Sequence, residues 1–226
     1  MPSSRRVTRE AIVEEARRLV AEQGTAALTF QALASILGVS KQAIIYWYPS
    51  KRELVRDFCL PVLMEERDVV TAAMADAKSA TEAIEKFVRS LVAHHLRDLG
   101  RFRMLYLWIQ FEPDIAARQG DEHLLAPIHE TMSASYDVLE SKIALDRSFV
   151  GNGDARLLAV AVDMAAMGLI TMIAMAEAMN DPWRHSTESM VDSLIALLTG
   201  KHRSGDGDSG SAPRAAAFGK PVRNLE

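Results

Sequence analysis

The chain has 226 residues, of which 49% are apolar and 25% are charged, and its 26 basic and 30 acidic side chains give a formal net charge of −4. This composition is too apolar for an intrinsically disordered protein and too poor in glycine and proline for a fibrous one. A single cysteine, Cys59, excludes an intramolecular disulfide framework, and no apolar stretch follows the N-terminal residues. We therefore expect a cytoplasmic globular protein of one large domain or two modest ones.

The charge is distributed unevenly along the chain. Residues 1–58 carry nine basic and six acidic side chains, residues 59–200 carry 12 and 21, and residues 201–226 carry five and three. A basic segment on an acidic body is expected of a protein that binds a polyanion at one end. The excess at the N-terminus is small enough to arise by chance, so the charge alone does not decide the function.

Three helices are predicted before residue 50, each with a start and a stop signal. A side-chain oxygen can cap the first turn of a helix, and glycine or proline favours its end. The signals are Thr8 and Gly24 for the first helix, Thr29 and Gly38 for the second, and Ser40 and Pro49 for the third.

A long fourth helix is expected from about Lys51 to Ala77, with Ser50 as its cap and Pro61 inside it. Apolar residues continue at helical spacing after this point, and no segment alternates as a strand would. The further helices are predicted at roughly 80–99, 101–112, 122–146, 152–179 and 184–199. The fold class is therefore all-α, and the Gly- and Ser-rich segment 201–226 is expected to be a flexible tail.

The segment Leu157 to Ala176 is apolar enough to raise the question of a membrane span. Asp163 inside such a span would cost about 2.5–3.5 kcal/mol, and no cluster of Lys or Arg flanks the segment. We therefore expect a helix buried in the core or in a subunit interface, and no membrane partner.

The second and third helices have the pattern of a helix-turn-helix, with the turn at Gly38-Val39-Ser40. Ala32, Leu33 and Ile36 are expected to pack on the first helix and so fix the angle of the pair. The third helix would then present the polar residues at its N-terminal end to base edges in the major groove of DNA.

Several residues of this region suit contacts to DNA. Gln42 can bond adenine bidentately, and Lys41 can donate to guanine or to a phosphate. Tyr46, Trp47 and Tyr48 are consecutive and cannot all face inward on a helix, so at least one of them is expected to be exposed. Ile44 and Tyr48 lie four residues apart on one face and are expected in the core. The candidate DNA-binding residues are Arg5, Arg6, Thr29, Ser40, Lys41, Gln42, Ala43, Tyr46, Trp47 and Lys51.

Residues 8–54 resemble the DNA-binding domain of the TetR family of bacterial transcriptional repressors. The resemblance is carried without gaps by Ile12, Ala16, Leu19-Val20 and Gly24, by Thr29, Ala32-Leu33-Ala34 and Leu37-Gly38-Val39-Ser40, and by Tyr46, Tyr48-Pro49-Ser50-Lys51 and Leu54. Three places depart from the commonest pattern: Trp47-Tyr48 stands where His-Phe is usual, Gln42 where Gly is frequent, and Ile45 where Tyr is frequent. These departures bear on the base contacts rather than on the fold.

The resemblance implies a three-helix helix-turn-helix domain over residues 1–58 and a helical ligand-binding and dimerisation domain over residues 59–200. It implies a homodimer that represses from a palindrome-like operator in double-stranded DNA and is released by a small-molecule inducer. The last two helices would form the four-helix bundle of the dimer. Repression rather than activation rests on the family alone.

A mostly apolar ligand cavity with a few polar anchors is expected in the C-terminal domain. The candidate ligand-binding residues are His95, Tyr106, Trp108, His129, Met132, Tyr136, Met164 and Met167. Core packing is the alternative for each of them. Adjacent acids such as Glu65-Glu66 are expected on solvated faces rather than as a functional pair.

An enzyme is the main rival class, but the chain has no nucleophile elbow and no phosphate-binding glycine loop, and Cys59 has no evident activating neighbour. His94-His95, or residues 121–123 with His129, would suit a metal-responsive regulator, although their spacing matches no common zinc pattern. A ligand-independent regulator and a purely structural helical module are further alternatives. We expect no catalytic residue, no metal and no cofactor.

Overall fold

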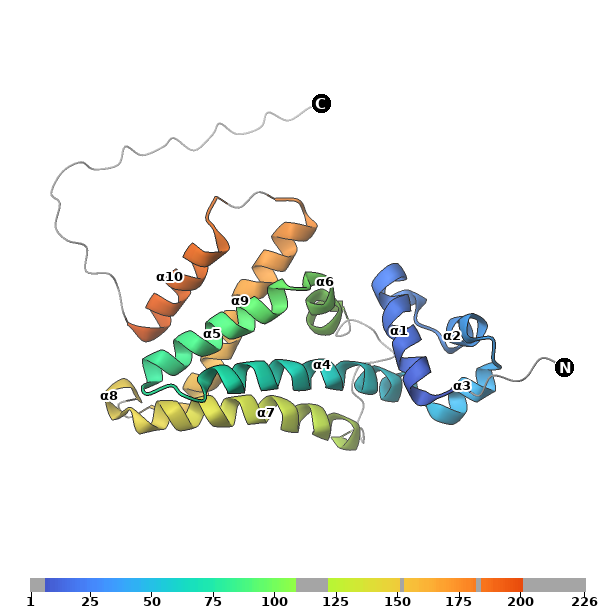
Figure 1. The fold of residues 1–226 in the computed structure, drawn as a ribbon, viewed down its shortest axis with the longest axis horizontal. Coiled ribbons are helices and arrows are strands. Elements are labelled where there is room, and N and C mark those ends of the chain that lie inside the picture. Colours follow the sequence, from blue (N-terminus) through green and yellow to red (C-terminus); the bar gives the residue numbers. More distant parts are fainter. Residues whose placement is uncertain (1–6, 109–121, 151–152, 182–183, 201–226) are drawn as a thin grey trace, which may run out of the picture.

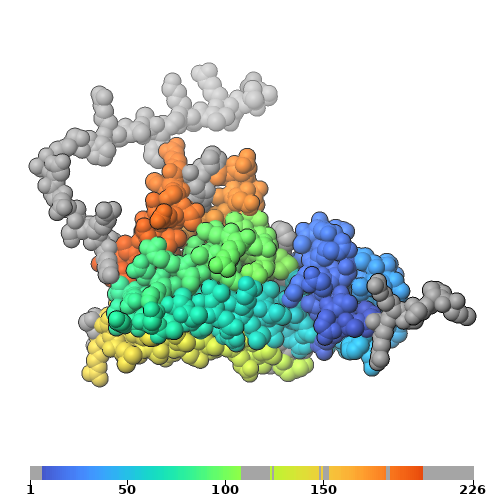
Figure 2. Space-filling view, in the orientation of Figure 1, coloured from blue at the N-terminus to red at the C-terminus, as the bar shows by residue number. Residues whose placement is uncertain are grey.

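The computed structural model describes residues 7–108, 122–150, 153–181 and 184–200, and every element in these ranges is helical. The elements are α1 (Arg9–Gln23), η1 (Thr25–Ala27), α2 (Phe30–Leu37), α3 (Lys41–Trp47), α4 (Lys51–Met74), α5 (Ala80–Leu96), α6 (Leu99–Phe102), η2 (Arg103–Trp108), α7 (Glu122–Leu145), α8 (Arg147–Val150), α9 (Ala155–Ala178) and α10 (Thr187–Thr199). Figure 1 shows α1 to α3 gathered at one end, a group called the head here, and the remaining helices packed into a body; the space-filling view in Figure 2 shows the same division. The tail 201–226 and the arm Arg5-Arg6 lie outside the described residues.

The predicted caps of the first four helices are confirmed. In each case the side-chain oxygen accepts a hydrogen bond from the backbone N–H three residues ahead, at 3.0 to 3.3 Å. These bonds satisfy donors that the first turn of a helix leaves unpaired. The residues are Thr8, Thr29, Ser40 and Ser50.

The head has its own core, formed where α1, α2 and α3 pack on the first half of α4. Leu33 and Ala34 are buried on α2, but Ile36 is 42% exposed, so the prediction that Ile36 packs on the first helix is wrong. Successive helical residues are rotated by about 100°, and Ile36 lies more than a quarter turn from the face centred on Leu33 and Ala34.

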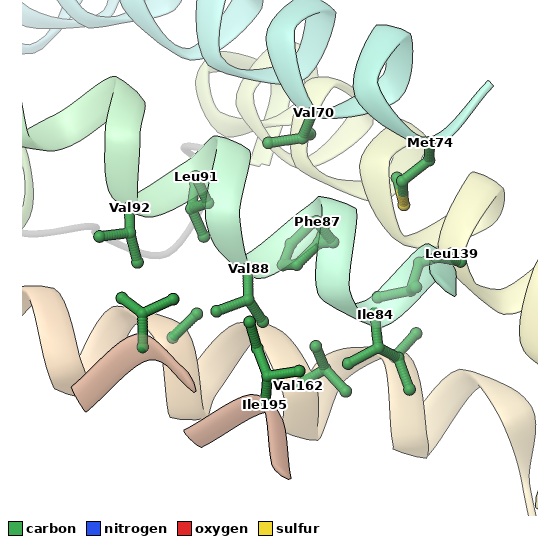
Figure 3. Packing of buried hydrophobic residues seen from close by; sticks show 14 of the residues in the cluster. Val70, Met74, Ile84, Phe87, Val88, Leu91, Val92, Leu139, Val162 and Ile195 are labelled. Atoms are coloured by element: carbon green, nitrogen blue, oxygen red, sulfur yellow. The ribbon is translucent and has the colours of Figure 1, made fainter. Parts of the chain in front are cut away.

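The body has a second core, which surrounds α5 (Figure 3). Side chains of α4, α7, α9 and α10 converge on this helix, so that Phe87 and Val88 are almost fully buried. The helix α4 belongs to both cores, because Leu54 to Leu63 contribute to the head and Val70 and Met74 to the body. One continuous helix thus crosses the domain boundary that we expect near residue 58.

The segment after α5 differs from the single helix predicted over 101–112. Asp98 caps α6 by accepting a hydrogen bond from the Arg101 N–H at 2.8 Å, so Gly100 lies inside a helix instead of ending one. A π-helical turn, η2, follows directly, and residues 109–112 lie outside the described ranges. A short helix that the sequence did not predict, α8, follows α7.

Among the described helices, α9 is long and apolar enough to satisfy the length and composition of a membrane span. The core helix of a soluble protein satisfies the same criteria. One face of α9 is buried in the body core, where Ala159, Ala166 and Ile170 are fully covered. The prediction that this helix is buried on most sides, in the core or in a subunit interface, is correct for this face only, because Leu157, Met164 and Met172 are exposed in the single chain.

Candidate functional site

The turn between α2 and α3 is held by backbone geometry. Gly38 has a φ of +66°, a left-handed conformation that costs glycine little and other residues more. The Val39 N–H then donates to the Ala34 carbonyl at 3.0 Å, and the Ser40 hydroxyl accepts from the Ala43 N–H at 3.2 Å. These bonds fix the direction in which α3 leaves the turn.

One side of α3 faces solvent and the other faces the core. Lys41, Gln42 and Tyr46 are exposed, and 79% of the Tyr46 surface is free. Ile44 and Tyr48 are completely buried, as predicted. The exposed face of α3 therefore carries polar and aromatic groups that are suited to base edges and phosphates.

The other candidate DNA-binding residues surround this face. Thr29 and Ser40 are exposed at the N-termini of α2 and α3, where their hydroxyls act as caps, and Ala43 is half-buried. Trp47 is half-buried and makes an edge-to-face contact with Tyr46, with the ring centroids 5.5 Å apart. Lys51 begins α4. The contacts of these residues with DNA stay a prediction.

A partly buried polar network behind α3 connects three helices. The Arg9 guanidinium donates to the Tyr48 hydroxyl at 3.1 Å and to the Asp57 carboxylate at 2.7 Å, and the Tyr48 hydroxyl donates to the same carboxylate at 3.1 Å. Burial raises the pKa of Tyr48 to about 12. Burial alone would raise the pKa of Asp57, but hydrogen bonds from Arg56 and Arg9 lower it overall. The network fixes α3 relative to α1 and α4.

Several basic residues of the head pair with acidic residues of the same chain. Arg9 and Arg56 pair with Asp57, and Arg18 pairs with Glu15 and Glu22, so acids of the head partly compensate the charge of these arginines. Lys41 makes no ion pair with any described residue, so its exposed charge is not compensated in this way.

The body contains a cavity of about 180 Å³ lined by residues of α4, α5, η2, α7 and α9. Four of the predicted ligand-binding residues line it, and so do two acids that the sequence did not suggest. The predicted residues are Tyr106, Met132, Tyr136 and Met167, and the acids are Glu66 and Asp163.

The polar groups of the cavity form two pairs. The Tyr106 hydroxyl donates to Glu66 Oε2 at 2.6 Å, and His95 Nε2 lies 3.1 Å from the same oxygen. The Tyr136 hydroxyl donates to Asp163 Oδ2 at 2.9 Å. Burial raises the pKa of Asp163 to about 6; the bond from Tyr136 opposes this shift and the charge of Glu66 adds to it.

The remaining ligand candidates lie elsewhere. Met164 is 68% exposed on the outer face of α9, and His129 is exposed on α7, so neither lines the cavity. The Trp108 side chain lies outside the described part of the structure. The prediction that Glu66 lies on a solvated face is wrong. Glu65 pairs with Arg101, whereas the neighbouring Glu66 faces the cavity. The isolated Asp163 in an apolar segment was a usable signal for the cavity.

Asp163→Asn is expected to stabilise the folded chain at neutral pH. The pKa of this acid is higher in the folded state, about 6, than its ordinary value of 3.8, so ionisation costs folding free energy. The cost is absent below about pH 4 and complete above about pH 6. The variant should gain about 1–3 kcal/mol in urea unfolding at pH 7.5, and the gain should shrink toward pH 4. A gain that does not change with pH would contradict this assignment, and Asp68→Asn, on an exposed site of α4, is the control.

No group of three or more His, Cys, Asp or Glu side chains that could hold a metal is present among the described residues, which do not include Asp121. Of the candidate metal ligands, His94 has its Nε2 atom 3.2 Å from Arg101 Nη2. Burial, followed by the charges of His95 and Arg101, lowers the pKa of His94. Burial raises the pKa of the Cys59 thiol to about 12, which disfavours the reactive thiolate.

These elements define a helix-turn-helix protein with an all-α C-terminal body. Residues 12–58 match the family described as bacterial regulatory proteins, tetR family. The HTH-type transcriptional regulator BetI of Rhizobium meliloti (strain 1021) is 32% identical over 83 residues, which cover 37% of this chain and 41% of BetI. The match thus spans about two fifths of that relative.

Solved structures share the fold over most of their length. The fatty acid degradation regulator FadR from Bacillus halodurans has a TM-score of 0.63 and 16% identity, covering 86% of this chain and 96% of that one. The transcriptional regulator FadR from Bacillus subtilis in complex with stearoyl-CoA has a TM-score of 0.62 and 15% identity, covering 85% and 98%. A TetR/AcrR family regulator from Thermobifida fusca YX-ER1 has a TM-score of 0.57 and 19% identity, covering 86% and 98%. Residues 12–58 thus belong to the TetR family of bacterial regulatory proteins, and the solved structures share the fold of most of the chain.

Proposed function

We propose that the chain is a dimeric, sequence-specific repressor whose α3 contacts bases in the major groove and which a small molecule releases from DNA. The observation that carries this proposal is the geometry of α3. Its N-terminal end exposes Lys41 and Gln42 after a fixed turn, while Ile44 anchors the opposite face in the core. A recognition helix requires this combination of a rigid support and a polar exposed end. The protein would act in the cytoplasm, at operators on the nucleoid.

An exposed apolar stripe on α9 supports a dimer. Its large members recur at helical spacing and are 47% to 73% exposed: Leu157, Met164, Met172, Met175 and Met179. A Cβ added at Gly168, between Met164 and Met172, would meet no atom within 4 Å, so a second helix could approach closely there. We infer that α9 and α10 of two copies pair, which would place the two α3 helices for successive major grooves about 34–36 Å apart.

The helix α4 connects the cavity in the body with the head, which contains α3, so a shift of α4 at the cavity would also move α3. Glu66 lies on α4 between the part packed in the head core and the part packed in the body core. Tyr106 bonds Glu66 and packs against both cores. A ligand that binds one position of α4 more tightly than the other would shift the population of head positions and thereby the spacing of the two α3 helices.

Gln42→Ala and Lys51→Ala are expected to weaken DNA binding in different ways. Loss of the Gln42 amide should relax the preference for one base pair by about 1–3 kcal/mol, because the amide can bond adenine bidentately. Loss of Lys51 should weaken binding to all sequences and flatten its salt dependence, because a phosphate contact carries no sequence information. Affinities for matched and single-mismatch duplexes at several salt concentrations separate the two effects. Identical behaviour of both variants would contradict the assigned roles.

The proposed function is tested by selection from random double-stranded DNA with the full chain at low salt. We expect enrichment of a palindrome-like site whose half-sites are about one helical turn, or a multiple of it, apart. Failure to enrich any such site would overturn the repressor hypothesis.

A further inference from the structure

We propose that the body cavity binds a small organic cation, such as a protonated amine or a quaternary ammonium ion, held between Glu66 and Asp163. The inference deepens the proposed function, since it names the class of ligand for the cavity, and it rests on the proposal that the body senses a ligand. The two acids come from different helices, α4 and α9, and both line the same cavity. Two carboxylates that face one cavity favour a positively charged occupant.

Each carboxylate keeps one oxygen available to a ligand. Tyr106 and His95 both contact Oε2 of Glu66, and Tyr136 donates to Oδ2 of Asp163. The other oxygen of each acid makes no hydrogen bond with the described residues. A carboxylate can accept about four hydrogen bonds, so both acids retain capacity for an N–H donor.

The charge at the cavity is not neutralised by a permanent cation. No Lys or Arg is among its described lining residues, and the positive charge nearest to the Tyr136 ring, Arg156, bonds Ser133 and pairs with Asp137 and Glu140. His95, whose Nε2 lies 3.1 Å from Glu66 Oε2, also lowers the pKa of Asp163 electrostatically. Burial, the largest cause, and the charge of Glu66 raise the pKa of Asp163 more than Tyr136 and His95 lower it, so a negative charge there costs free energy. A bound cation would offset this cost.

The rest of the wall suits the hydrocarbon part of such a ligand. Phe87, Tyr106 and Tyr136 contribute aromatic rings, which attract cations through their faces. Val70, Leu91 and Met167 contribute apolar surface. The volume of about 180 Å³ lies below the roughly 300–1,000 Å³ of sites for drug-sized ligands, so the occupant is small. A long acyl chain brings no positive charge and would leave both carboxylates uncompensated.

The test compares three probes of similar shape and different charge: cyclohexylamine, which is protonated at pH 7.5, cyclohexanol and cyclohexanecarboxylate. Calorimetry with the full chain in the absence of DNA measures their affinities, and methyl signals of ¹³C-labelled Met132 and Met167 report whether they enter the cavity. We expect the amine to bind at least about tenfold more tightly than the alcohol, and the carboxylate to bind weakest. Stearoyl-CoA is added as a fourth probe, because a structural neighbour binds it.

Asp163→Asn and Glu66→Gln keep the size of each side chain and remove its charge. Each substitution should weaken binding of the amine at least about tenfold and leave the affinity for the alcohol unchanged, because only the charged probe interacts with the carboxylate. Asp68→Asn, on an exposed site of the same helix as Glu66, is the matched control and should leave both affinities unchanged.

The proposal is overturned if the amine and the alcohol bind equally, if the two cavity variants bind the amine like the parent chain, or if stearoyl-CoA alone shifts the methionine signals. Absence of cyclohexylamine binding at millimolar concentration overturns it as well. These results concern the cavity alone. A chain that selects a DNA site but rejects cations refutes the ligand class, whereas a chain that binds cations but selects no DNA refutes the proposed function.

Discussion

Met164→Glu is expected to convert the protein to a monomer and to lower its affinity for a selected operator by about 10²–10⁴-fold. Met164 is 68% exposed at the middle of the apolar stripe of α9. In a symmetric pair a glutamate there would be buried against the partner stripe without a counter-charge, close to its own symmetry copy. Separate heads bind half-sites singly and lose the gain in effective concentration that a linked pair provides.

Sedimentation and DNA titration of the same preparation measure both effects. Met64→Glu is the matched control, because Met64 is also an exposed methionine, 40% exposed, but lies on α4 away from the stripe. This control should remain dimeric. A dimeric Met164→Glu variant with full DNA affinity would show that the exposed face of α9 is not the interface.

Ile44→Ala is expected to lower the free energy of unfolding of the head by about 2–5 kcal/mol and to reduce DNA affinity with it. Ile44 is completely buried between the helices that support α3, so its truncation leaves a cavity under the recognition helix. The body does not depend on this residue, and the oligomeric state should not change. Urea unfolding followed by tryptophan fluorescence, together with DNA titration, measures the loss.

Ile36→Ala makes the same chemical change at an exposed position of the neighbouring helix, where we expect a change within about 0.5 kcal/mol. If both variants lost the same stability, the burial of α3 on the head core would not be what positions it.

The helices of the head could be predicted from the sequence because their limits are local. Thr29, Ser40 and Gly38 act on backbone groups within a few residues of themselves, so their effect does not depend on the rest of the fold. The burial of Ile44 and Tyr48 followed from their spacing of four on one face. The exposure of Ile36 could not be predicted in this way, because the rotation of a short apolar helix depends on its neighbours.

The candidate ligand site could be predicted only in part. Aromatic and methionine residues were recognisable from composition, and four of them line the cavity. The pairing of Glu66 with Tyr106, and of Asp163 with Tyr136, depends on how α4, η2, α7 and α9 pack, which no local signal encodes. Met164 illustrates the same limit, since a methionine stripe on α9 gives no indication of which side faces the cavity.

The proposed function is tested most directly by the affinity of the full chain for a selected duplex and for a scrambled duplex of the same length and composition, with the stoichiometry of each complex. We expect two chains on the selected duplex and a preference for it of about 10³ or more, together with a steep fall in affinity as salt is raised. Equal affinity for the two duplexes, or one chain on the selected one, would contradict it.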